Sequence, residues 1–304
     1  MNSPVVLGGP RLVVVTGKGG VGKSTVAAAL GVAMARAGLR AIVVEVAARE
    51  DVPPLLDAVG GAEREIYPGL HHVSIDPDAA LGEYLREQLP FGPLAGLIGR
   101  SDLFLMFAAA TPGMHELLTV GKVAELARER RSDAARPYDI VVLDAPSTAN
   151  GLALLAAPRT FAASARVGPI ARQGAEIDAL LCDPERTAIV LVATLEEMPV
   201  TEAAGLRADV RRVLHRDVDR VVANGVLPSR FRARDREALA HAHDDPAVRS
   251  ARWLERRARL QRVQRERLRR ASAGVAFSSL PMLFSPHPGR ADIERLARRL
   301  GGAR

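Results

Sequence analysis

A glycine-rich loop with two lysines is the part of the chain with the clearest capacity for chemistry. It reads G-K-G-G-V-G-K-S-T and consists of Gly17, Lys18, Gly19, Gly20, Val21, Gly22, Lys23, Ser24 and Thr25. The spacing G-x-x-x-x-G-K-[ST] is that of a P-loop, whose glycines let backbone N–H groups curl around a phosphate. Lys23 adds a full positive charge to this cradle. The pattern predicts a binding site for the phosphates of a nucleotide such as ATP.

The second lysine of the loop, Lys18, is unusual. The chain has 42 basic residues, and only Lys18, Lys23 and Lys122 are lysines. A chain that uses arginine almost everywhere has lysine at both loop positions. This indicates that a compact ammonium group is needed there, rather than any cation.

A nucleotide site also needs ligands for Mg²⁺. A loop hydroxyl and a carboxylate at the end of a neighbouring strand are the usual pair. Ser24 supplies the hydroxyl, and Asp144, directly after the apolar run 140–143, is the best candidate for the carboxylate. A carboxylate at the end of a buried strand is costly unless a metal or hydrogen bonds satisfy it. That end of the sheet is where open α/β folds bind their ligands.

Asn224 follows another apolar run, residues 221–223. Its amide has donors and an acceptor that suit the edge of an adenine ring. The residue also precedes Gly225, and Asn-Gly is a strong turn signal. Both interpretations stay open on spacing alone.

The order of apolar runs along the chain predicts an α/β fold with a mostly parallel sheet. Short Val- and Ile-rich runs alternate with helical stretches, which is typical of a parallel sheet covered by helices on both faces. We expect a first helix over 26–37 that ends at Gly38. The expected strands lie at 12–15, 41–44, 70–75, 139–143, 188–192, 220–223 and 274–277.

Two segments lack strand signals and predict helical insertions, at about 79–132 and 230–272. We expect a single domain over residues 1–304, because no linker or repeat divides the chain. The first insertion contains the apolar segment 103–110. This segment is either core or, if exposed, a groove for a hydrophobic protein client.

Charge and cysteine content limit the partners and the compartment. The net charge is +7, and ten arginines lie within 249–270. We interpret this stretch as a solvated helix face, and the alternative is a surface for lipid headgroups or a phosphate backbone. Trp253 is its only aromatic residue, which argues against nucleic acid and leaves peripheral membrane contact open. Cys182 is the only cysteine, and no secretory signal precedes the loop, so we expect a cytoplasmic protein.

The loop with its extra Lys18 resembles the deviant Walker A motif of a P-loop ATPase family, and five further features resemble its ArsA/Get-type branch of anion-transporting ATPases. Residues 144–149 are similar to the branch's switch II motif, and 111–117 are similar to its P-G-x-x-E segment. Asn224 matches its adenine-reading asparagine, and Pro281 resembles the loop that closes over the base. The Glu45-Val46 strand ending is most similar to bacterial ArsA-like ATPases.

The resemblance implies a P-loop NTPase fold and ATP hydrolysis with Mg²⁺. It also implies a homodimer, or a paired heterodimer with a similar ATPase, that couples nucleotide state to conformational change for an unnamed client. Lys18 would then reach the partner's phosphates, as an arginine finger does. The single cysteine excludes both the three-cysteine arsenite site and the C-x-x-C zinc pair known in this branch.

Two departures from the family pattern predict slow hydrolysis. Ala47 stands at or near the aspartate that positions the attacking water, and Ala149 replaces a switch II glycine. Glu45, Glu50 and Asp51 are candidate replacements for the aspartate. Glu45 is two residues earlier in the strand, which keeps its side chain on the same face but moves it by about 6–7 Å. Glu45 could instead form a structural ion pair.

These departures leave two alternative functions open. The chain could be a catalytically weak ATP-binding subunit of a paired ATPase. It could also be a ParA/MinD-type positioning ATPase that associates with DNA or membrane through its basic stretch.

Overall fold

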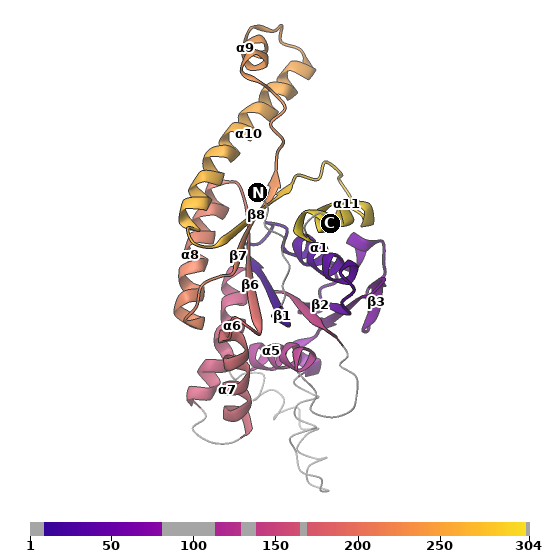
Figure 1. Cartoon of the computed structure of the whole chain (residues 1–304), viewed down its shortest axis with the longest axis vertical. Helices are drawn as coiled ribbons and strands as arrows, with labels where there is room; N and C mark the ends of the chain where they lie inside the picture. Colours follow the sequence, from indigo (N-terminus) through magenta and orange to yellow (C-terminus); the bar gives the residue numbers. More distant parts are fainter. Residues whose placement is uncertain (1–8, 81–112, 129–137, 165–168, 302–304) are drawn as a thin grey trace.

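A single eight-stranded sheet organises the computed structural model, which describes residues 9–80, 113–128, 138–164 and 169–301. The strand order is β3-β4-β2-β5-β1-β6-β7-β8. Every neighbouring pair is parallel except β3–β4. The predicted α/β fold with a mostly parallel sheet is therefore confirmed (Figure 1). The strands are β1 (Leu12–Gly17), β2 (Ala41–Val46), β3 (Arg64–Tyr67), β4 (Leu70–Ile75), β5 (Ile140–Asp144), β6 (Thr187–Thr194), β7 (Arg220–Val226) and β8 (Ala276–Pro281).

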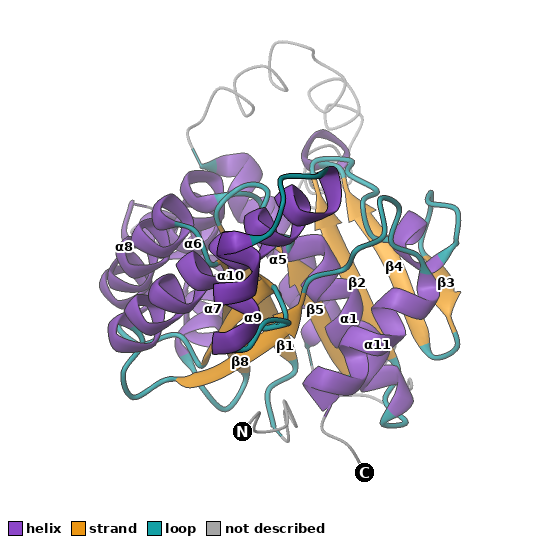
Figure 2. Cartoon of the chain, turned by 90° about the horizontal axis from the view of Figure 1, so that it is seen from above, coloured by secondary structure: helices purple, strands orange, loops and turns teal. Residues whose placement is uncertain are grey.

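Helices cover both faces of the sheet, as the apolar runs of its strands require (Figure 2). One core lies under α1 and α11, and the other lies under α5 to α8. The helices are α1 (Lys23–Arg36), η1 (Pro53–Leu56), α5 (Met114–Ala127), α6 (Thr148–Ser164), α7 (Pro169–Cys182), α8 (Glu197–Leu214), α9 (Ala233–His241), α10 (Pro246–Ala271) and α11 (Arg290–Gly301). In α11, Ile293, Leu296 and Leu300 are buried, because this helix packs on α1.

The described parts of the two predicted insertions are helical. In the first, α5 is described, whereas the segment 103–110 lies outside the described residues. In the second, α9 and α10 extend away from the sheet (Figure 1). Most of the arginines on α10 are exposed. No helix among the described residues is both long enough and apolar enough to span a bilayer.

Two strand predictions need correction. The edge strand β3 was not predicted, because its four residues, Arg64–Tyr67, include two charged side chains and one large apolar residue at the core. The last strand covers 276–281 rather than 274–277, since Gly274 has a φ of +82° and still belongs to the turn after α10. Pro281 is consequently the last residue of β8, opposite Val226 of β7, and does not lie in the loop after the strand.

Candidate nucleotide-binding site

The glycine-rich loop connects the end of β1 to the start of α1, at the centre of the sheet. A Cβ atom at Gly17 would lie 2.3 Å from the carbonyl oxygen of Val192 on neighbouring β6, so only glycine fits there. Gly22 has a φ of +86°, a left-handed conformation that glycine adopts without strain. Helix α1 begins at Lys23 and directs its positive dipole end into the loop. Together these features form the phosphate cradle that the sequence predicts.

Asn224 lies beside this loop rather than in a free turn. Its side-chain Nδ2 donates a hydrogen bond to the Val21 carbonyl oxygen at 2.9 Å. The same amide lies so close to Gly22 that a Cβ atom there would come within 2.3 Å of Nδ2. Asn224 therefore supports the loop from β7. Gly225, with a φ of +67°, lies within β7 where its pairing with β8 shifts register. The structure brings Asn224 to the predicted site, and reading of adenine stays a prediction.

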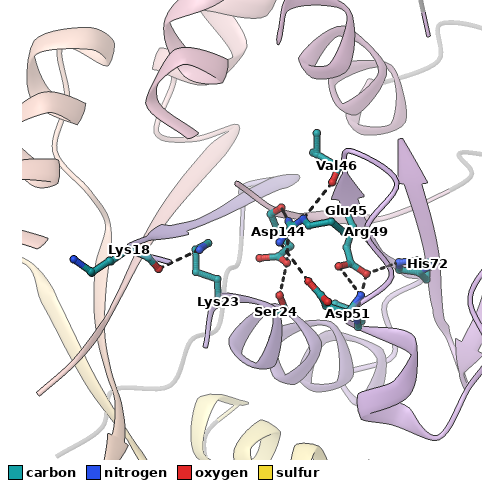
Figure 3. A network of polar contacts seen from close by, with 10 residues as sticks. Lys18, Lys23, Ser24, Glu45, Val46, Arg49, Asp51, His72 and Asp144 are labelled. Carbon is teal, nitrogen blue, oxygen red and sulfur yellow. Dashed lines mark hydrogen bonds and ion pairs between the residues drawn. The ribbon is translucent and has the colours of Figure 1, made fainter. Parts of the chain in front are cut away.

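Ser24 and Asp144, the predicted Mg²⁺ ligands, are in contact. Ser24 Oγ donates a hydrogen bond to Asp144 Oδ2 at 2.7 Å, at the end of β5 next to the loop (Figure 3). Asp144 is completely buried. Burial raises the pKa of its carboxyl group to about 6, although the Ser24 hydrogen bond and the Arg49 charge both oppose the rise. A carboxylate held at such a cost is typical of a functional group.

The second oxygen of Asp144 fits a metal ion. Asp144 Oδ1 is buried and has no hydrogen-bond partner among the described residues. A buried carboxylate oxygen without a partner is costly, and a hard cation with oxygen ligands satisfies it. Ser24 Oγ and Asp144 are thus suited to hold Mg²⁺, with the remaining ligands supplied by nucleotide phosphates and water.

The two lysines of the loop differ in their contacts. Lys23 is buried, and its Nζ reaches back to donate to the Lys18 carbonyl oxygen at 3.1 Å. Burial lowers the pKa of Lys23, and the charge of Asp144 opposes this effect. Lys18 instead points away from the Asp144 carboxylate (Figure 3) and pairs with Glu202 on α8. Lys23 alone is therefore at the phosphate cradle of its own chain.

Glu45 is committed to structural contacts. Its side chain is fully buried near the end of β2. Oε1 accepts a hydrogen bond from the backbone N–H of Asp51 and Oε2 from that of Val52, each at 3.0 Å. His72 Nε2 lies 2.8 Å from Oε2. These contacts leave Glu45 poorly placed to accept a proton from water, so they favour the structural alternative that the sequence left open.

The two alanines that depart from the family pattern lie in different backbone conformations. Ala47 and Ala48, after β2, have φ angles of 64° and 53°, which are uncommon for residues with a Cβ atom. Ala149 lies in the first turn of α6 and is exposed. Since α6 is helical there, Ala149 needs no positive φ, and the replacement of glycine does not strain this backbone.

Arg49 is a site residue that the sequence reasoning missed. Its Nη2 lies 3.1 Å from the Asp144 carbonyl oxygen and 3.4 Å from Asp144 Oδ2. Its Nε donates to the Val46 carbonyl oxygen at 3.2 Å. Its position two residues after Ala47 places it next to the expected switch residue, which could have indicated a role at the site. A single arginine does not stand out, however, in a chain with so many.

Comparison with known proteins identifies the family of the chain. The family model for anion-transporting ATPases matches residues 10–173. The chain is 32% identical over 250 residues to the ATPase BagA of Mycobacterium tuberculosis, covering 80% of this chain and 73% of that protein. It is 27% identical over 250 residues to the arsenical pump-driving ATPase of Acidiphilium multivorum, covering 76% of this chain and 42% of that protein. The chain therefore belongs to the ArsA family of anion-transporting ATPases.

Proposed function

We propose that this chain binds ATP with Mg²⁺ and hydrolyses it as one protomer of a homodimer or paired heterodimer. The observation that carries the proposal is the contact of Ser24 with buried Asp144, whose second oxygen has no protein partner in the described part of the chain. Mg²⁺ held by Ser24 and Asp144 would give this oxygen a partner, and the loop would hold the phosphates that share the metal ion. The nucleotide state would then drive conformational change for a client.

The contacts of Lys18 support the dimeric arrangement. A lysine that served its own nucleotide would be expected to point into the cradle, as Lys23 does. Lys18 is instead held outside it by Glu202, through an ion pair that is partly open to solvent. Such pairs contribute little free energy, so Lys18 can exchange Glu202 for a phosphate of the partner. A cation supplied in trans stabilises the charge of the transferring phosphoryl group.

A catalytically weak ATP-binding subunit is the second candidate function. The observation that favours it is that Ala47 at the expected switch position has no carboxylate, while both carboxylate oxygens of nearby Glu45 already accept hydrogen bonds. ATP binding would then serve a more active partner of the same fold.

ATP turnover by the isolated chain tests both candidates. We expect turnover that requires Mg²⁺ and rises more than linearly with protein concentration, because two protomers must meet around the nucleotides. ATP binding without measurable turnover at any concentration would favour the weak-subunit function instead. Absence of ATP binding by the folded chain would contradict both.

A further inference from the structure

Arg49 is a charged residue at the site that has no role in the function as proposed above. Its guanidinium group approaches the only carboxylate placed to hold Mg²⁺ among the described residues, at 3.4 Å from Asp144 Oδ2. The side chain is also 32% exposed, so it is accessible to solvent while it contacts the buried carboxylate (Figure 3). An arginine in such a place can contact a bound nucleotide without a large rearrangement of the chain.

The backbone is shaped to place this arginine. Ala47 and Ala48 are two successive residues in the left-handed region, a costly arrangement that persists only where its surroundings enforce it. Ala47 N donates to the Ile75 carbonyl oxygen at 2.9 Å, before the turn. The Glu45 carboxylate holds the backbone of 51 and 52 after the turn. The turn is thus fixed on both sides, and strained turns that are held in this way are concentrated at functional sites.

The charges around Asp144 favour an incoming anion. Two cationic side chains, Lys23 and Arg49, surround this one buried carboxylate, and the charge of Arg49 also lowers the pKa of Lys23. Asp51 lies 3.5 Å from Arg49 Nη1, but it is largely exposed and its interaction is screened by water. The charge of buried Glu45 also raises the pKa of Asp144, but the Glu45 carboxylate is held by the backbone N–H groups of 51 and 52. Lys23 and Arg49 are therefore the charges that an incoming phosphate would meet beside Asp144.

We propose that Arg49 is a ligand of the terminal phosphate of ATP and that its contact with Asp144 holds it in place until the nucleotide binds. This inference rests on the proposed function. A cation at Asp144 would repel the guanidinium group, and a γ-phosphate bound beside that cation is an anion that could receive it. Arginine recognises phosphate through two parallel N–H donors, so the contact is strong and directional. ADP lacks this phosphate, and Arg49 would consequently make the site prefer ATP.

Equilibrium binding of a non-hydrolysable ATP analogue and of ADP, both with Mg²⁺, tests the inference by calorimetry. Arg49→Gln should raise the Kd of the ATP analogue by about 10- to 100-fold, the range expected for a lost charged hydrogen bond. The Kd of ADP should change by less than about threefold. The Kd of Arg49→Lys for the ATP analogue should fall between those of wild type and Arg49→Gln, since an ammonium keeps the charge but lacks the two parallel N–H donors of a guanidinium group. Arg128→Gln, which removes an arginine from an exposed pair with Glu176, is the matched control and should change neither Kd.

Three results would overturn the inference. Equal weakening of both nucleotides by Arg49→Gln would mean that Arg49 acts only through Asp144, and unchanged binding of both would mean that it has no role. If the folded wild-type chain binds neither nucleotide, the proposed function itself fails, and that result is distinct from the other two. If Arg49→Gln does not fold, the affinities of Arg49→Lys for the ATP analogue and for ADP provide the same test, because this variant retains the charge beside Asp144.

Discussion

Replacing Asp144 with asparagine should stabilise the nucleotide-free chain while removing its response to Mg²⁺. Burial raises the pKa of Asp144 from 3.8 to about 6, so the folded chain binds its proton more tightly than the unfolded chain does. A rise of about two pKa units corresponds to about 3 kcal/mol of folding free energy lost when the group is ionised. Asparagine resembles the protonated carboxyl group and avoids that cost.

The sign of the pH dependence follows from the same shift. Between about pH 4 and pH 6 the folded state holds a proton that the unfolded state has already released, so stability falls as the pH rises. Above about pH 6 the loss is complete. Asp144→Asn should therefore melt about 5 °C above wild type at pH 8, and the difference should disappear near pH 4. Thermal melts at several pH values, followed by circular dichroism without nucleotide, measure both quantities.

Asp217→Asn is a control for which the change in stability at pH 8 should have the opposite sign. The Arg207 hydrogen bond holds the pKa of Asp217 at about 2, and the stability that this provides is present above about pH 4 and lost as the pH falls through 2. Asp217→Asn should thus lose about 1–2 kcal/mol at pH 8. An Asp144→Asn chain that is less stable than wild type at pH 8 would refute the reasoning, as would an unimpaired gain in its Tm on addition of Mg²⁺ and ATP.

Four further substitutions test individual contacts. Lys18→Ala should leave ATP affinity within about twofold of wild type but lower turnover by about tenfold or more, and unchanged turnover would disprove the trans role of Lys18. Glu202→Gln should free Lys18 and strengthen dimer formation with ATP, by up to about fivefold in sedimentation velocity experiments, whereas weaker association would contradict the ion-pair interpretation. Glu45→Gln places an amide against backbone N–H donors and should cost about 1–3 kcal/mol of stability in denaturant titrations; a stable chain that lacks only turnover would restore the catalytic role. Asn224→Ala should weaken ATP binding by about threefold to tenfold through loss of its bond to the loop, and unaltered affinity would exclude that role.

Local patterns were enough to predict most of the fold. The apolar runs before the P-loop and before Asp144 form β1 and β5, which are neighbours in the sheet with Val15 opposite Asp144. Gly38 follows α1 with a φ of +89°, as a helix stop should. These features depend on short stretches of sequence, and strand ends at one edge of a parallel sheet meet without further information. The contact of Ser24 with Asp144 follows from that rule.

Contacts between distant side chains could not be predicted in the same way. Arg49 reaches Asp144 only because Ala47 and Ala48 adopt left-handed conformations, which alanine rarely does. The role of Glu45 depends on His72 of β4 and on a chain reversal after β2, so its position in the strand suggested a catalytic as well as a structural use. Lys18 finds Glu202 on a helix that follows much later in the chain.

Calorimetric titration of the 304-residue chain with ATP, with Mg²⁺ and with a chelator in its place, tests ATP binding at the loop most directly. We expect one ATP per chain, tighter binding with Mg²⁺, and no detectable binding by Lys23→Ala, because that change removes the buried ammonium group at the phosphate cradle. Circular dichroism would show that Lys23→Ala remains folded. Equal affinity of Lys23→Ala and wild type, or no binding of ATP by the folded wild-type chain, would contradict ATP binding by this loop.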